Sequence, residues 1–169
     1  MVRITVSLLL LTIIGCQNKI ETKSMEGTHF KRSTLLVSDI DQSLTIYRDI
    51  LGFTVHNISE SSADSYSYPV FKIPEDATIR FCTLDSPDQV RTMALSEVKG
   101  IELPKQVTPH MNASVIRVKD LPTVMEKISA LKLQHTQPRI DTSSDGFVFK
   151  EQSFIDFDGH LIVIYEMTQ

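Results

Sequence analysis

The chain has 169 residues, enough for one domain of ordinary size, and its 41% hydrophobic and 22% charged residues are typical of a globular protein. The formal net charge at pH 7 is −4, which argues against a strongly basic protein. Because nucleic acids are bound largely through clustered lysine and arginine, we expect no nucleic-acid partner.

The first residues have the composition of an export signal. The apolar run Ile4–Ile14 is shorter than the roughly 20 residues that a membrane-spanning helix needs. It ends in Ile13-Ile14-Gly15-Cys16, which resembles the lipobox of bacterial lipoproteins. That resemblance implies a signal peptide over residues 1–15, lipid on Cys16 and a flexible polar linker over residues 16–27. We therefore expect a lipoprotein anchored to a membrane of the bacterial cell envelope, on its periplasmic or other extracytoplasmic side.

Residues 28–99 predict a strand, a helix and three more strands. The strand 30–37 is rich in β-branched and aliphatic residues, and Asp39 or Asp41 can cap the helix that follows. Gly52 lies where helices commonly end in a left-handed residue. The later elements are strands at 53–58, 78–84 and 90–98, with a polar excursion over residues 59–75 that is too long for a tight hairpin.

Residues 110–168 repeat this order after a linker over residues 100–109. The strand 113–118 precedes Asp120, which can cap a helix that extends through Leu133. The later elements are a loop with a weak strand over 134–145, and strands at 147–157 and 161–167 joined by Asp158-Gly159, a strong hairpin signal.

A repeated motif indicates that the two segments are copies of one unit. Val37-Ser38-Asp39-Ile40 returns as Val118-Lys119-Asp120-Leu121, at an offset of 81 residues. Repeats of this kind are supersecondary units that bury their apolar faces against each other. We therefore expect two βαβββ modules of the α+β class, with the functional site where they meet.

The segment from Val37 to Phe53, together with Asp156 to Gly159, resembles the vicinal oxygen chelate superfamily. This superfamily includes glyoxalase I, extradiol dioxygenases, fosfomycin-resistance enzymes and bleomycin-binding proteins. The resemblance implies two tandem modules whose sheets form a curved half-barrel around a shared cavity. The sequence leaves open whether the modules pair within one chain or across a homodimer.

The metal site of that superfamily is missing from this sequence. The resemblance places the metal-ligand positions at Arg32, Ala94, Ala113 and Val163, and none of these side chains binds a metal. His56 and His135 have no carboxylate or histidine at ligand spacing, and His160 is expected to be exposed. We expect neither a metal nor another cofactor.

Period-two alternation places a set of polar side chains on the cavity face of the predicted sheets. An arginine in a partly closed apolar site needs a partner, so Arg32 either pairs with an internal carboxylate, Asp156 or Glu97, or waits for an anionic ligand. Cys82 is expected to be buried and unreactive. The candidate ligand-binding residues are Arg32, Thr34, Thr92, Ser96, Arg117 and Tyr165.

Three functions remain in competition. A metal-free cavity favours a protein that binds a small molecule, and an acidic molecule if Arg32 has no internal partner. The predicted anchor also suits a structural or assembly lipoprotein that uses the fold as a scaffold. A glyoxalase-like lyase or a dioxygenase would need a metal site of unusual composition.

Overall fold

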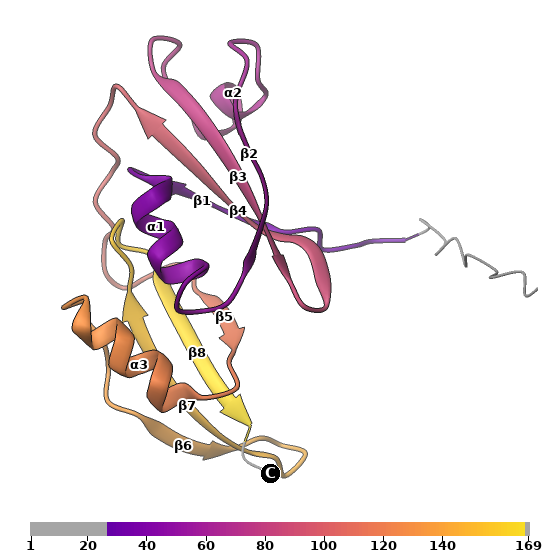
Figure 1. Cartoon of the computed structure of the whole chain (residues 1–169), viewed down its shortest axis with the longest axis vertical. Helices are drawn as coiled ribbons and strands as arrows, with labels where there is room; N and C mark the ends of the chain where they lie inside the picture. The colour runs from indigo at the N-terminus through magenta and orange to yellow at the C-terminus, as the bar shows by residue number, and fades with distance from the viewer. Residues whose placement is uncertain (1–26, 168–169) are drawn as a thin grey trace, which may run out of the picture.

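The protein folds into two four-stranded sheets with two main helices on one side of them (Figure 1). The structure, a computed structural model, describes residues 27–167, and every helix among them is too short or too polar to cross a membrane. The first half contains β1 (Ser33–Val37), α1 (Ile40–Tyr47), β2 (Thr54–Glu60), α2 (Ser67–Phe71), β3 (Thr78–Ser86) and β4 (Gln89–Lys99). The second half contains β5 (Ser114–Arg117), α3 (Leu121–Ala130), β6 (Arg139–Thr142), β7 (Val148–Ile155) and β8 (Leu161–Met167).

Both sheets have the same topology. The strand order is β1-β4-β3-β2 in the first sheet and β5-β8-β7-β6 in the second. In each sheet the first strand is parallel to the last, and the other neighbours are antiparallel. Within the described residues no ladder joins the two sheets. The repeat in the sequence therefore corresponds to two βαβββ units, and the predicted α+β class is confirmed.

The two modules also repeat the hydrogen bonds at the start of their main helices, including one that the sequence motif does not indicate. Asp39 and Asp120 cap α1 and α3, each accepting a hydrogen bond from the backbone N–H three residues further on, at 2.9 and 3.0 Å. A glutamate from the last strand of each module, Glu97 or Glu166, accepts a bond of 2.7 Å from the first N–H of the helix. Two carboxylates thus satisfy backbone donors at each positively polarised helix start.

Some predicted boundaries are wrong by a few residues. β1 begins at Ser33 and not at residue 30. α3 ends at Ala130, because Lys132 adopts a left-handed conformation with φ of 58° and stops the helix before Leu133. The polar excursion over residues 59–75 contains a short helix, α2, which the sequence analysis does not predict.

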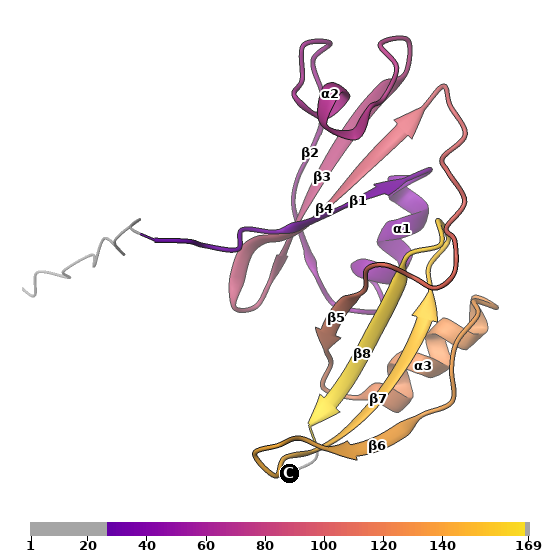
Figure 2. The same ribbon diagram turned by 180° about the vertical axis from the view of Figure 1, so that it is seen from behind.

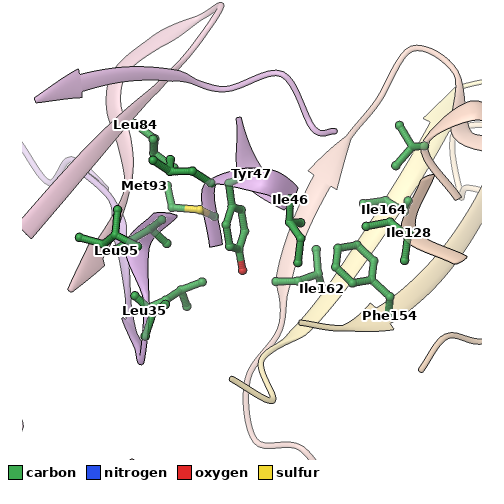
Figure 3. Packing of buried hydrophobic residues seen from close by; sticks show 14 of the residues in the cluster. Leu35, Ile46, Tyr47, Leu84, Met93, Leu95, Ile128, Phe154, Ile162 and Ile164 are labelled. Carbon is green, nitrogen blue, oxygen red and sulfur yellow. The ribbon is translucent and has the colours of Figure 1, made fainter. Parts of the chain in front are cut away.

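One hydrophobic core joins the two modules. Both main helices lie on the same side of the sheets, in front in Figure 1 and behind in Figure 2. Residues of α1 and the first sheet belong to the same buried cluster as residues of α3 and the second sheet. Ile46 of α1, fully buried, points toward Ile162 and Phe154 of the second module (Figure 3). Neither module therefore buries its apolar helix face alone.

The turn between β7 and β8 adds polar contacts to this interface. Asp156, only 5% exposed, accepts a hydrogen bond of 2.7 Å from the Tyr47 hydroxyl and further bonds from the backbone of its own turn. In the same turn, Asp158 accepts a bond from the N–H of Ser38, and His160 Nε2 lies 2.8 Å from the carbonyl oxygen of Leu36. The turn thereby fixes the outer edge of β1.

We predict that Tyr47→Phe lowers the free energy of unfolding by about 1–2 kcal/mol, because a buried carboxylate loses one of its donors. Burial and the negative charge of Asp156 also raise the pKa of Tyr47 well above its ordinary value, so the hydroxyl stays protonated as a donor. Urea unfolding followed by circular dichroism measures the change. Tyr66→Phe is the control, since Tyr66 is 80% exposed. Equal stability of the Tyr47→Phe variant and the wild type would contradict this account.

Candidate functional site

The candidate site lies on the face of the first sheet that is turned away from α1. On the helix side, Leu35 and Leu95 belong to the main core. Because side chains alternate along a strand, their neighbours Thr34, Ala94 and Ser96 project to the other face. Thr34 and Ala94 are paired across β1 and β4 in the same row. This is the face that the sequence analysis assigns to the cavity.

The excursion between β2 and β3 covers one half of this face. Tyr68 and Ile73 from the excursion pack with Ile79 and Val98 of the sheet into a second small core. Leu36 of β1 is packed against the same cluster. Figure 1 shows α2 at this end of the first sheet, far from the second module. The excursion therefore fills part of the predicted cavity and leaves the other half open.

The open half contains a cavity of about 470 Å³. Its lining combines cationic, polar and aromatic side chains. Arg32 lies with its guanidinium carbon 5.3 Å from the centre of the Phe81 ring, a distance at which a cation is attracted by an aromatic face. The residues that line the cavity are Lys31, Arg32, His56, Asn57, Phe81, Thr83 and Arg91.

Asp85 organises one wall of the cavity. Its Oδ1 accepts a hydrogen bond of 2.6 Å from the backbone N–H of Arg91, and its Oδ2 lies 3.0 Å from Nδ1 of His56. The bond from Arg91 and, to a smaller extent, the contact with His56 lower the pKa of the Asp85 carboxyl. The ionised carboxylate thus holds both residues in place.

Irregularities in the strand ladders bring His56, Asn57 and Arg91 to the same cavity. The register between β2 and β3 shifts between Val55 and Asn57, and the register between β3 and β4 shifts at the end of β3. Arg91 has a positive φ of 55°, in the left-handed region that L residues rarely adopt. In a regular strand His56 and Asn57 would point to opposite faces, whereas a bulge re-aims side chains in this way.

The four residues to which the superfamily resemblance assigns the metal-ligand positions do not suit a metal ion. Arg32 is a cation, and Ala94, Ala113 and Val163 carry no donor atom. Among residues 27–167, no group of three or more His, Cys, Asp or Glu side chains is placed to hold a metal.

The structure places the predicted ligand-binding residues in three locations. Arg32 lines the cavity, and together with Thr92 and Arg117 it also lines a broader crevice of about 1390 Å³ between the modules. Thr34 and Ser96 lie on the cavity face but do not line the cavity, and the hydroxyl of Ser96 is buried without a hydrogen-bond partner. Tyr165 lies on the second sheet, opposite Arg117. Cys16 lies outside the described residues.

The internal partners predicted for Arg32 are engaged elsewhere. Glu97 binds Arg80 at 3.0 Å and the start of α1, and Asp156 binds Tyr47 and its own turn. In the described part of the chain, no carboxylate lies within 4.0 Å of the Arg32 guanidinium. The ion-pair interpretation of Arg32 is therefore wrong, because both candidate carboxylates are used to hold the helix start and the module interface.

Six of the seven lining residues are not among the predicted site residues, and two expectations about histidines are wrong. His160 is half-buried and not exposed, because it reaches the backbone of β1. His56 has a carboxylate partner that lies 29 residues away in the sequence, on the neighbouring strand. Cys82 is buried as predicted, and burial raises the pKa of its thiol to about 11. The lining residues that were not predicted are Lys31, His56, Asn57, Phe81, Thr83 and Arg91.

The comparisons with known proteins agree with this fold. The profile of the Glyoxalase/Bleomycin resistance protein/Dioxygenase superfamily matches residues 29–164, and the chain belongs to this superfamily. The comparison with curated proteins found no match.

Three solved structures illustrate the similarity, and all are less than 25% identical, so they show the fold alone. A glyoxalase family protein from Bacillus cereus has a TM-score of 0.66 and 11% identity, over 89% of this chain and 99% of that chain. The fosfomycin resistance protein FosX from Listeria monocytogenes, solved with Mn(II) and sulfate, has a TM-score of 0.56 and 16% identity, over 85% and 95%. Leishmania major glyoxalase I has a TM-score of 0.52 and 17% identity, over 83% and 87%.

We predict that Arg91→Gly is more stable than Arg91→Ala by about 1 kcal/mol, because a left-handed backbone disfavours every residue with a Cβ atom. Thermal and urea unfolding of the two variants measure the difference. The same pair of substitutions at Arg48, which has φ of −85°, is the control and should show the opposite order. Greater stability of Arg91→Ala would mean that residue 91 does not hold this conformation.

Proposed function

We propose that this protein binds a small acidic molecule without the help of a metal ion. The observation that carries the proposal is that Arg32 lines a cavity and has no carboxylate partner in the described part of the chain. This arginine stands where the superfamily resemblance puts a metal ligand, and it lines a cavity beside Phe81. The two carboxylates expected to pair with it, Glu97 and Asp156, bind other groups. A guanidinium in such a place is a two-oxygen binding group for a carboxylate or a phosphate.

The remaining lining supports binding of an organic anion. Lys31 and Arg91 add two further cations, and Asn57 and Thr83 add polar groups that can orient a ligand. Phe81 offers an aromatic surface for the apolar part of the molecule. A concave site with a few convergent polar groups and an apolar wall is the usual form of a small-molecule site.

We predict that Arg32→Leu keeps the fold and weakens the binding of a small aromatic anion by about 2 kcal/mol, the scale of a charge-assisted contact. Isothermal titration of the purified full-length protein with phenyl sulfate and with phenyl phosphate measures the affinity. Arg48→Leu is the matched control, because Arg48 is paired with Asp49 on the surface of the first module. A chelator in the buffer should leave the affinity unchanged.

Two outcomes would contradict this proposal. If neither anion binds the wild type, the scaffold function, in which the fold supports assembly without a ligand, becomes the better account. If binding or an enzymatic activity requires an added divalent metal, the protein is a metal-dependent member of the superfamily.

Light scattering on the same samples shows whether the protein is a homodimer.

We also propose that the mature protein is anchored to a membrane of the bacterial envelope through lipid on Cys16. The support is the apolar run that ends in Ile13-Ile14-Gly15-Cys16. Such an anchor would place the cavity close to a membrane surface, outside the cytoplasm.

Cys16→Ala should abolish lipidation and leave the precursor unprocessed, while Cys82→Ala, at the other cysteine of the chain, should not. Mass spectrometry of the N-terminus and fractionation of membranes measure both effects. Normal processing and unchanged membrane partition of Cys16→Ala would contradict the lipobox interpretation.

A further inference from the structure

The charges that line the cavity do not balance. Lys31, Arg32 and Arg91 contribute three positive charges, and the lining contains no aspartate or glutamate. Within residues 27–167, none of these three cations forms a salt bridge with a carboxylate. Asp85 stands at the edge of the cavity, and both of its oxygens are already engaged by Arg91 and His56.

An ordinary carboxylate ligand would leave this cavity with an excess of positive charge. The attraction between charges grows in proportion to the charge of each partner, so a doubly charged anion gains about twice as much as a singly charged one at the same position. A phosphomonoester carries a charge of about −1.5 to −2 at pH 7 and offers three acceptor oxygens. Two guanidinium groups and an ammonium group can satisfy those oxygens together.

The neutral part of the lining is consistent with an ester and not with a bare inorganic ion. Phe81 forms an apolar wall beside Arg32, and Thr83, another lining residue, is buried. His56 has its Nδ1 turned to Asp85, so its Nε2 is the ring nitrogen left for a ligand. A cavity of about 470 Å³ has room for a phosphate group and a small organic substituent.

We propose that the cavity selects a phosphomonoester dianion, with the phosphate among Lys31, Arg32 and Arg91 and the organic group against Phe81. This inference rests on the proposed function, because it specifies the charge of the acidic ligand. Asp85 acts as a positioning residue, since it holds Arg91 by its backbone and His56 by its ring.

The test compares two probes that differ mainly in charge. Phenyl phosphate is a dianion at pH 8, and phenyl sulfate has nearly the same shape with a single negative charge. Isothermal titration of the purified full-length protein in low salt should give phenyl phosphate a Kd at least tenfold lower than phenyl sulfate. Lys31→Gln and Arg91→Gln should each reduce that ratio. Arg139→Gln should not, because Arg139 lies on the second sheet and is paired with Asp141.

The outcomes separate this inference from the proposed function. Equal affinities for the two probes, both weakened by Arg32→Leu, would overturn the selection for a dianion and leave anion binding intact. Binding of neither probe would overturn both. An unchanged ratio in Lys31→Gln and Arg91→Gln, with thermal unfolding as in the wild type, would place the phosphate outside this cluster.

A competition experiment with phenyl phosphate shows whether the phosphomonoester is a lipid headgroup or a soluble metabolite. Vesicles that contain phosphatidic acid, whose headgroup is a phosphomonoester, displace phenyl phosphate if the cavity can reach a lipid headgroup. Vesicles of phosphatidylcholine, a phosphodiester, are the control. Displacement by the first and not by the second identifies a lipid source, and displacement only by soluble phosphomonoesters identifies a free metabolite. Equal displacement by both vesicles would contradict selection for a phosphomonoester.

Discussion

The carboxylate of Asp156 is the contact on which the arrangement of the two modules depends. It is almost fully buried at their interface and accepts hydrogen bonds from Tyr47 and from the backbone of its own turn. A buried carboxylate is costly unless its oxygens are satisfied, so the turn and α1 must keep their relative positions. The same turn reaches the outer edge of β1 through Asp158 and His160. The second module thus holds the C-terminal end of β1, while Arg32, at the other end, is flanked by contacts with β4 of its own module.

The cavity depends on departures from regular strand geometry. A regular ladder presents only alternate side chains to one face, and on that pattern His56 and Asn57 could not line the same cavity. The bulge in β2 and the left-handed Arg91 remove this restriction, at a cost in backbone energy that Asp85 offsets through its two hydrogen bonds. Backbone strain clusters at functional sites in proteins, so its presence here supports the proposal that the cavity binds a ligand.

The sequence was sufficient for the elements that follow local rules. The caps at Asp39 and Asp120, the left-handed Gly52 and the burial of Cys82 all follow from residue type and spacing. The site was predicted less well, because the cavity wall is built from residues that meet across strands. The contact of His56 with Asp85 spans 29 residues, and neither the bulge nor the conformation of Arg91 has a signature in the local sequence. The pairing of Arg32 was also misjudged, since the carboxylates considered for it have structural duties that only the fold reveals.

The cationic cluster has no evident role in holding the fold together. Lys31, Arg32 and Arg91 repel one another, and in the described structure none of them forms a salt bridge that would offset this repulsion. The cost is small while water screens Lys31 and Arg91, which are exposed. It would rise if a ligand displaced that water without bringing negative charge. The same three positive charges therefore disfavour the binding of a neutral ligand and favour the binding of an anion. On the proposed function, these side-chain cations supply the attraction for ligand oxygens that a metal ion would otherwise provide.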